Sequence, residues 1–326
     1  MIRLPPFRYL APRSVEEAVA MKAEHGRAAM YVAGGTDLFP NMKRRQFEPQ
    51  VLIGLCGLEE LRGVSNGGGF TIGAGTTLSE VANHPQVQRQ YPSLARAAGL
   101  VSSPPLRNLG TLGGNLCVDT RCTYYNQSHA WRKALGFCMK KDGDVCWVAL
   151  SSPGCLAVSS SDCAPVAISL GAQVRLIGPQ GERMIPAEAL YRNDGMQYLA
   201  LRPDELLVSI HLPPMLGWRT SYLKLRRRGS IDFPILGVAV ALRSEEDGTC
   251  TEARLVLAAV ASQPVPVPEA AGLLIGHRIT ADLVNEAAEM AARRAKPLDN
   301  TDMGLSFRKK MARVYVRRAL AEAAGT

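Results

Sequence analysis

The sequence lacks the features that mark several large protein classes. No run of about 18 apolar residues occurs in its 326 residues, so no membrane span is expected. The first residues, MIRLPPFRYLAPRS, contain no continuous apolar segment of a signal peptide, which predicts a cytoplasmic location. The sequence shows no helix-turn-helix pattern, no zinc-finger spacing and no aromatic RNP-like strand, so nucleic acid is not an expected partner.

The composition is that of an ordinary globular protein, with 47% hydrophobic and 21% charged residues. A chain of this length is expected to form two or three packed units. The net charge is +9, with basic clusters at 43–45, 226–228 and 308–318. These clusters are interpreted as solvated surface, and attraction of an acidic partner is the alternative.

The pattern of apolar residues and helix caps predicts an α+β chain. Capping boxes at Ser14/Glu17 and Thr77/Glu80 predict two helix starts, the second helix ending near 84–85. Segment 104–115 holds too many prolines and glycines for a regular element, which predicts a shaped loop. A domain boundary is expected at 213–217. Strands are expected at 30–33, 51–55, 70–74, 166–176, 206–212, 222–225, 237–242 and 253–259, and further helices at 91–100, 281–294 and 306–323.

Two glycine-containing loops could bring backbone N–H groups close to cofactor phosphates. The first follows an expected strand and spans 32–38, and the second spans 110–115. Neither matches G-x-G-x-x-G or G-x-x-x-x-G-K-[ST], which disfavours Rossmann and P-loop folds. Each loop by itself is better explained as a structural turn.

Cysteine is concentrated in one segment. Six of the eight cysteines lie between Cys117 and Cys163, in a polar stretch with little periodicity. Disulfides are uncommon in a reducing compartment, so metal or redox use is expected. Four thiolates suit either a [4Fe–4S] cluster or zinc. The absence of C-x-x-C pairs favours the cluster and leaves zinc as the alternative.

One of these motifs resembles a known family. The segment Leu106-Arg107-Asn108-Leu109-Gly110-Thr111-Leu112-Gly113-Gly114-Asn115 is similar to the "IRNxGTxGGN" signature of the FAD subunits of the xanthine dehydrogenase and carbon monoxide dehydrogenase family. The loop at 33–38, Ser161-Asp162 with Pro165, and Tyr222-x-Lys224 resemble further motifs of that family in the same order, over essentially the whole chain.

The resemblance implies the fold and the flavin contacts. It predicts a two-subdomain FAD-binding (PCMH-type) domain at 1–216 and a sheet-plus-helices domain of the carbon monoxide dehydrogenase flavoprotein type at 217–326. The first loop would hold the pyrophosphate, the second the phosphate and ribityl region, Asp162 the hydroxyls, and Lys224 the polar edge of the flavin. The implied FAD contacts are Tyr31, Val32, Ala33, Gly34, Gly35, Thr36, Asp37, Leu38, Ser102, Leu106, Gly110, Thr111, Gly114, Asn115, Asp162, Leu207 and Lys224.

The cysteine-rich insertion, about 117–161, resembles one subfamily, the beta subunits of 4-hydroxybenzoyl-CoA reductases. The resemblance lies in segment 115–128 and in the later Gly136-Phe137-Cys138 and Gly143-Asp144-Val145-Cys146. It implies that Cys122, Cys138, Cys146 and Cys155 hold a [4Fe–4S] cluster. The other cysteines, Cys56, Cys117, Cys163 and Cys250, would then be packed thiols.

The resemblance also implies a function and partners. Electrons would pass from ferredoxin through the cluster and FAD to [2Fe–2S] clusters on a small subunit and a molybdenum cofactor on a large one. The complex would be a dimer of heterotrimers that removes a ring hydroxyl from an aromatic acyl-CoA, with no catalytic residue on this chain. Two alternatives stay open. One is a FAD subunit of a related dehydrogenase or hydroxylase that passes electrons outward, and the other is a zinc-stabilised basic binding protein.

Overall fold

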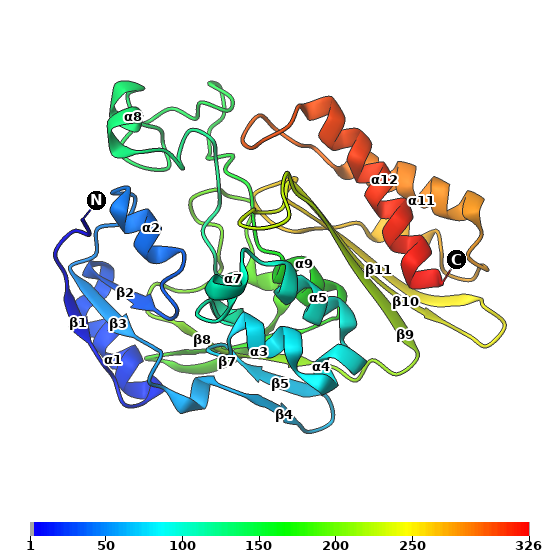
Figure 1. Cartoon of the computed structure of the whole chain (residues 1–326), viewed down its shortest axis with the longest axis horizontal. Helices are drawn as coiled ribbons and strands as arrows, with labels where there is room; N and C mark the ends of the chain where they lie inside the picture. The colour runs from blue at the N-terminus through cyan, green and yellow to red at the C-terminus, as the bar shows by residue number, and fades with distance from the viewer. Residues whose placement is uncertain (1–2, 326) are drawn as a thin grey trace.

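Three sheets organise the chain, and the computed structural model describes residues 3–325 (Figure 1). The first sheet is parallel, in the order β1-β3-β2, and helix α1 packs on it. The Ser14 side chain accepts a hydrogen bond from the Glu17 backbone N–H at 3.1 Å and so caps α1, as predicted. The bounds are β1 Arg8–Leu10, α1 Val15–His25, β2 Ala29–Val32, α2 Leu38–Lys43 and β3 Val51–Gly54.

The second sheet is antiparallel, in the order β4-β5-β8-β6-β7. Its core includes Phe70, Leu94, Leu112 and Val166, contributed by the sheet and by the helices packed against it. The capping box of Thr77 and Glu80 is present in full at the start of α3. The bounds are β4 Val64–Asn66, β5 Phe70–Gly73, α3 Leu78–Asn83, α4 Pro85–Gln90, α5 Pro92–Leu100, α9 Cys163–Ser169, β6 Gln173–Gly178, β7 Gly181–Pro186 and β8 Leu206–Leu212.

Two predictions about this region are wrong. Segment 104–115 is not a loop throughout, because it contains the short helices α6 Pro104–Arg107 and α7 Leu112–Leu116. The expected strand at 166–176 divides into helix α9 and strand β6. Every residue of α9 is buried, so its apolar run carries no periodicity that could separate a buried helix from a buried strand.

The third sheet is antiparallel, in the order β12-β11-β10-β9, and it lies between two layers of helices. Ala239 and Val256 face the core of the second sheet, whereas Val238 and Leu257 pack against α11 and α12. The arrangement confirms the α+β class and the C-terminal sheet-plus-helices unit. The bounds are β9 Trp218–Leu225, β10 Leu236–Ser244, β11 Cys250–Ala258, β12 Val265–Pro266, α10 Pro268–Gly272, α11 Ala281–Arg294 and α12 Leu305–Ala324.

The cysteine-rich insertion projects from the second unit and lies beside α2 (Figure 1). It has one helix, α8 His129–Ala134, and is otherwise irregular. The Gln46 side chain donates a hydrogen bond to the Tyr125 carbonyl at 2.5 Å. Arg132 is 1% exposed, and its guanidinium donates to the Arg44 carbonyl at 2.8 Å. The insertion is therefore attached to the side of the molecule that carries α2.

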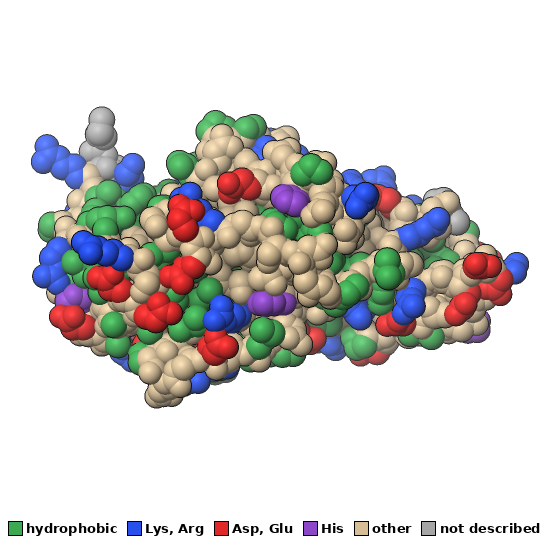
Figure 2. Space-filling model, turned by 90° about the horizontal axis from the view of Figure 1, so that it is seen from below, with side chains coloured by type: hydrophobic (Ala, Val, Ile, Leu, Met, Phe, Trp, Pro, Cys, Tyr) green, Lys and Arg blue, Asp and Glu red, His purple; other side chains and the backbone are tan. Residues whose placement is uncertain are grey.

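On the face shown in Figure 2, acidic and basic side chains are interspersed among scattered apolar ones. The net charge of +9 is thus accompanied by mixed signs on this face. Within residues 3–325, no helix is both long enough and apolar enough to cross a membrane.

Candidate functional site

The first glycine loop meets the second one directly. A Cβ atom on Gly34 would lie 1.8 Å from the Leu109 carbonyl oxygen, so only glycine permits this contact. Gly110 attaches the second loop to the start of α3, because its carbonyl accepts a hydrogen bond from the Leu78 N–H at 2.8 Å. The two loops that the sequence separates by about 75 residues therefore form one surface, as the resemblance implied.

The first loop leaves its backbone donors free. Among residues 3–325, the N–H groups of Gly34, Gly35, Thr36 and Asp37 have no hydrogen-bond acceptor on the chain. All four residues are half-buried. Free backbone donors in a loop that can approach a ligand closely suit a phosphate group, so this loop fits the pyrophosphate of FAD.

The second loop uses most of its polar groups internally. The Thr111 hydroxyl accepts a hydrogen bond from the Gly114 N–H at 3.1 Å, and the Gly113 N–H donates to the Ala74 carbonyl at 2.8 Å. The Asn115 side-chain oxygen accepts from the Ser161 hydroxyl at 2.8 Å and from the Cys163 N–H at 3.0 Å. Asn115 therefore places Asp162 beside the loop, and the backbone donors without an acceptor lie mainly in the first loop.

Asp162 and Lys224 form a buried ion pair. The Lys224 ammonium lies 2.8 Å from the Asp162 carboxylate, and the side chains are 1% and 3% exposed. The Tyr222 hydroxyl donates to the same carboxylate at 2.7 Å. Burial raises the pKa of Asp162, and the Lys224 charge opposes this shift. The Lys224 charge is thus balanced by the Asp162 carboxylate, and its place at the polar edge of the flavin stays a prediction.

The other residues predicted to contact the flavin differ in how exposed they are. Ser102 has a φ of 44°, and its carbonyl accepts a hydrogen bond from the Ile231 N–H at 3.0 Å. Leu106 is half-buried and its carbonyl accepts from the Gly110 N–H at 2.7 Å. Leu207 is 5% exposed within the core of the second sheet. The Tyr31 hydroxyl is buried and has no hydrogen-bond partner among the described residues.

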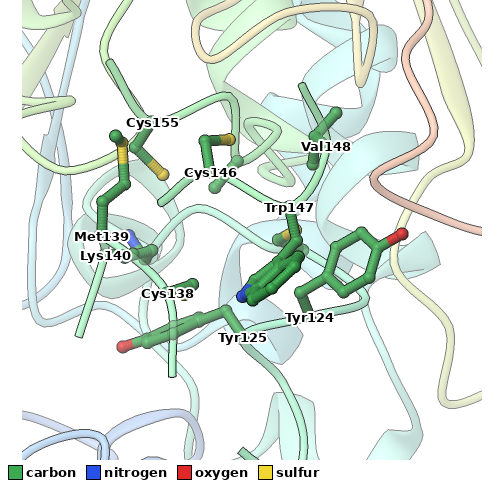
Figure 3. A pocket seen from close by; sticks show the side chains of 11 residues that line it. Tyr124, Tyr125, Cys138, Met139, Lys140, Cys146, Trp147, Val148 and Cys155 are labelled. Atoms are coloured by element: carbon green, nitrogen blue, oxygen red, sulfur yellow. The ribbon is translucent and has the colours of Figure 1, made fainter. Parts of the chain in front are cut away.

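The four predicted cysteine ligands surround one cavity. Cys122, Cys138, Cys146 and Cys155 are each 5–8% exposed and line it together. Figure 3 shows three of them arriving from separate backbone segments around a common space. Apart from Lys140, the other lining residues are aromatic or aliphatic: Tyr124, Tyr125, Met139, Trp147, Val148 and Ala157.

The thiols surround a space and do not converge on a point. Among the described residues, no three His, Cys, Asp or Glu side chains are close enough together to hold a single metal ion. Burial raises the pKa of the Cys122 thiol to about 12 and that of Cys155 to about 11. These thiols stay protonated unless a bound cation stabilises the thiolates. The arrangement fits a multi-iron cluster better than one zinc ion.

Two residues of this site carry no motif and were missed in the sequence. The Lys140 ammonium lines the cavity and donates to Asp119 at 2.8 Å, to the Thr120 hydroxyl at 2.7 Å and to the Gly195 carbonyl at 2.5 Å. Gly195 lies outside the insertion, yet its N–H donates to the Cys155 carbonyl at 2.9 Å. Only the tertiary structure brings these residues to the cysteines.

The other four cysteines lie away from the cavity. Cys163 and Cys250 are fully buried and Cys117 is half-buried, as expected for packed thiols. Cys56 is exposed, so its assignment as a packed thiol is wrong. It lies in the turn after β3, and its thiol contacts the Ala33 carbonyl at 3.1 Å.

Comparison with known proteins matches both halves of the chain. Residues 5–215 match the family described as "FAD binding domain in molybdopterin dehydrogenase", and residues 220–323 match "CO dehydrogenase flavoprotein C-terminal domain". The carbon monoxide dehydrogenase medium chain of Hydrogenophaga pseudoflava is 31% identical over 320 residues, covering 97% of this chain and 96% of that one.

Two further relatives agree with these matches. The aldehyde oxidoreductase FAD-binding subunit of Escherichia coli (strain K12) is 34% identical over 269 residues, covering 79% of this chain and 82% of that one. A solved structure of carbon monoxide dehydrogenase from Hydrogenophaga pseudoflava, which lacks the Mo-pyranopterin moiety of its cofactor, superposes with a TM-score of 0.82. It is 30% identical and 99% of each chain is covered.

Proposed function

The chain belongs to the FAD-binding medium-subunit family of the molybdenum hydroxylases, and we propose that it binds FAD between its two glycine loops and exchanges electrons with partner subunits. The observation that carries this proposal is the contact between Gly34 and Leu109, beside four backbone N–H groups without acceptors on the chain. FAD supplies the ability to take up electrons in pairs and release them singly.

The chain's own residues would hold and orient the flavin nucleotide. Gly34, Gly35, Thr36 and Asp37 would donate backbone hydrogen bonds to the pyrophosphate. Thr111, Gly114 and Asn115 shape the opposite wall, because their own hydrogen bonds fix that loop against Ser161. The Asp162–Lys224 ion pair lies next to this loop, because Asn115 binds Ser161 and Cys163 on either side of Asp162, and its opposite charges offset each other.

We further propose that the insertion holds a [4Fe–4S] cluster through Cys122, Cys138, Cys146 and Cys155. The supporting observation is the shared cavity of four buried thiols, which come from separate loop segments. A cluster there would exchange single electrons with the flavin. The zinc-stabilised basic binding protein does not fit as the function, because both halves of the chain match flavoprotein families.

The direction of electron flow separates two candidate complexes. The names of the relatives, a carbon monoxide dehydrogenase and an aldehyde oxidoreductase, favour a dehydrogenase or hydroxylase whose flavin passes electrons outward. The cysteine-lined cavity favours the reductive candidate of the 4-hydroxybenzoyl-CoA reductase type, with ferredoxin as donor. Both candidates require a large molybdenum subunit and a small subunit with two [2Fe–2S] clusters, arranged as a dimer of heterotrimers.

Anaerobic purification of the full chain tests the cofactor content. We expect flavin absorption, about four irons per chain and little zinc, with iron lost in Cys122→Ser or Cys138→Ser. Cys250→Ser, at a buried thiol that does not line the cavity, is the matched control and should keep its iron. A chain that binds flavin but no iron would overturn the cluster assignment. A chain that binds zinc but no flavin would overturn the whole proposal.

The direction is tested on the assembled complex. Ferredoxin-dependent loss of the ring hydroxyl from 4-hydroxybenzoyl-CoA would support the reductive candidate. Oxidation of an aldehyde or N-heterocycle, with electrons delivered to a quinone or dye and no reductase activity, would support the outward one.

A further inference from the structure

Arg121 lies at the neck of the cysteine-rich insertion, directly before the cavity residue Cys122. Its N–H donates to the Val158 carbonyl at 2.8 Å, and its carbonyl accepts from the Val158 N–H at 2.7 Å. This bridge joins the two chain segments that enter and leave the cysteine-rich part. The backbone of Arg121 is therefore held by the same short ladder that holds the cavity.

The side chain of Arg121 reaches the first glycine loop at Asp37. Its guanidinium is 12% exposed, forms an ion pair with Asp37 and lies 3.5 Å from the Asn41 side-chain oxygen. It also stacks over the Phe233 ring, 4.2 Å from the ring centroid. Burial lowers the pKa of Arg121 to about 10, so it stays charged at neutral pH.

The charge of Asp37 needs this partner. Asp37 is in the loop whose N–H groups are proposed to face the two phosphates of FAD, and its side chain is only 31% exposed. A carboxylate there repels phosphate, and low solvent access strengthens that repulsion. The Arg121 guanidinium offsets the carboxylate. Asn41 donates a weaker neutral hydrogen bond to the same carboxylate at 3.0 Å and cannot offset its charge.

Few buried apolar side chains hold the interior of the insertion together. Its apolar cluster has five buried members, Cys122, Tyr125, Cys138, Cys155 and Ala157, and three of them are cavity cysteines. A group bound by the thiols would therefore supply much of the stability of this segment. Loss of that group would loosen Cys122 and, with it, the adjacent Arg121.

We propose that Arg121 couples the two cofactor sites, so that filling the cysteine-lined cavity strengthens FAD binding. This inference rests on the proposed function, because it requires both groups to bind this chain. By thermodynamic reciprocity, FAD must strengthen retention of the cluster by the same factor. Arg121 acts as a positioning residue, through Asp37, and need not touch the flavin.

The test is a flavin-fluorescence titration of the full chain, iron-loaded and after anaerobic removal of iron by a chelator. We expect FAD to bind about 5- to 150-fold more weakly to the iron-free chain. Arg121→Met should bind weakly in both forms. The double variant Arg121→Met/Asp37→Asn should regain affinity, because the unbalanced carboxylate is gone. Lys133→Met, an exposed charge loss in the same insertion, should behave like the unaltered chain.

Equal FAD dissociation constants with and without iron would overturn the coupling. So would an iron dependence that survives in Arg121→Met, or a double variant that is no better than the single one. A chain that binds FAD but no iron would overturn the cluster assignment itself, and the coupling with it. The failure of the coupling alone is distinguishable, because both cofactors then bind but independently.

Discussion

The Sγ atom of Cys155 leaves no room for a side chain at Gly195. A Cβ atom there would lie 2.7 Å from Sγ, 2.7 Å from the Ala157 nitrogen and 2.8 Å from the Cys155 carbonyl oxygen. Two of these neighbours are backbone atoms, which cannot move aside cheaply. A loop outside the insertion thus fixes the position of one cavity thiol.

Gly195→Ala should therefore displace Cys155 and reduce the iron content of the chain while FAD binding by the glycine loops persists. Overpacking of this kind costs about 1–3 kcal/mol. Iron analysis and thermal unfolding check it. The matched control is Gly154→Ala, because nothing lies within 4 Å of a Cβ at that position. Full iron occupancy in Gly195→Ala would contradict the role of this contact.

Lys140 should set the reduction potential of a cluster in the cavity. Its side chain is 6% exposed, and its ammonium favours the more negative, reduced cluster. Lys140→Met should lower the potential and Asp119→Asn should raise it, because Asp119 offsets part of the Lys140 charge. An anaerobic redox titration followed by electron paramagnetic resonance measures both shifts, with the more exposed Lys141→Met as control. Shifts of the same sign in both variants would contradict this electrostatic account.

Gly34→Ala should push the two glycine loops apart. The added Cβ would lie 1.8 Å from the Leu109 carbonyl oxygen and 2.4 Å from its carbon, so the backbone must move. A displacement of that kind costs about 1–3 kcal/mol, which corresponds to a loss of FAD affinity of about 5- to 150-fold. Flavin titration of the purified variant checks this, and Gly57→Ala, with open space around it, is the control. Unchanged affinity would place the flavin elsewhere.

Glu205 should make stability depend on pH in the acid range. The Arg183 side chain donates hydrogen bonds to it at 2.7 and 2.8 Å, and these lower the pKa of Glu205 below its ordinary value of 4.5. A lowered folded-state pKa gives stability that is present above pH 4.5 and is lost as the pH falls through the folded value.

Glu205→Gln should lower the free energy of unfolding at pH 7 by about 1.5–3 kcal/mol, the usual contribution of a charged hydrogen bond. It should also flatten the dependence of that free energy on pH below 4.5. Urea unfolding between pH 3 and 7 measures both effects, with the exposed Glu286→Gln as a matched charge change. A variant with the original slope would assign the acid sensitivity to other carboxylates.

The sequence was sufficient where structure depends on local hydrogen bonds or on clear periodicity. The Thr77/Glu80 capping box predicts the start of α3, because both of its hydrogen bonds lie within four residues. The amphipathic pattern of 281–294 predicts α11 within its observed bounds. Prediction from the sequence failed at α9, because burial of every residue there removes the periodic pattern of apolar residues.

Some residues of the candidate site could also be predicted from the sequence and others could not. The glycine loops and the four cavity cysteines carry recognisable patterns, so they could be named from the sequence. Arg121, Lys140 and Gly195 could not, because each acts through a partner distant in the chain. The Arg121–Asp37 pair spans 84 positions, and the Lys140–Gly195 contact spans 55.

The paired neck at Arg121 and Val158 has a consequence for how such an insertion can arise. Because its two ends are already hydrogen-bonded to each other, the insertion leaves and re-enters the scaffold at one point, whatever the length between them. The entropy of closing a loop grows only slowly with added residues. A segment with this geometry can change in length between its scaffold contacts, provided that the bridge and the contacts to Arg44, Gln46 and Gly195 are kept.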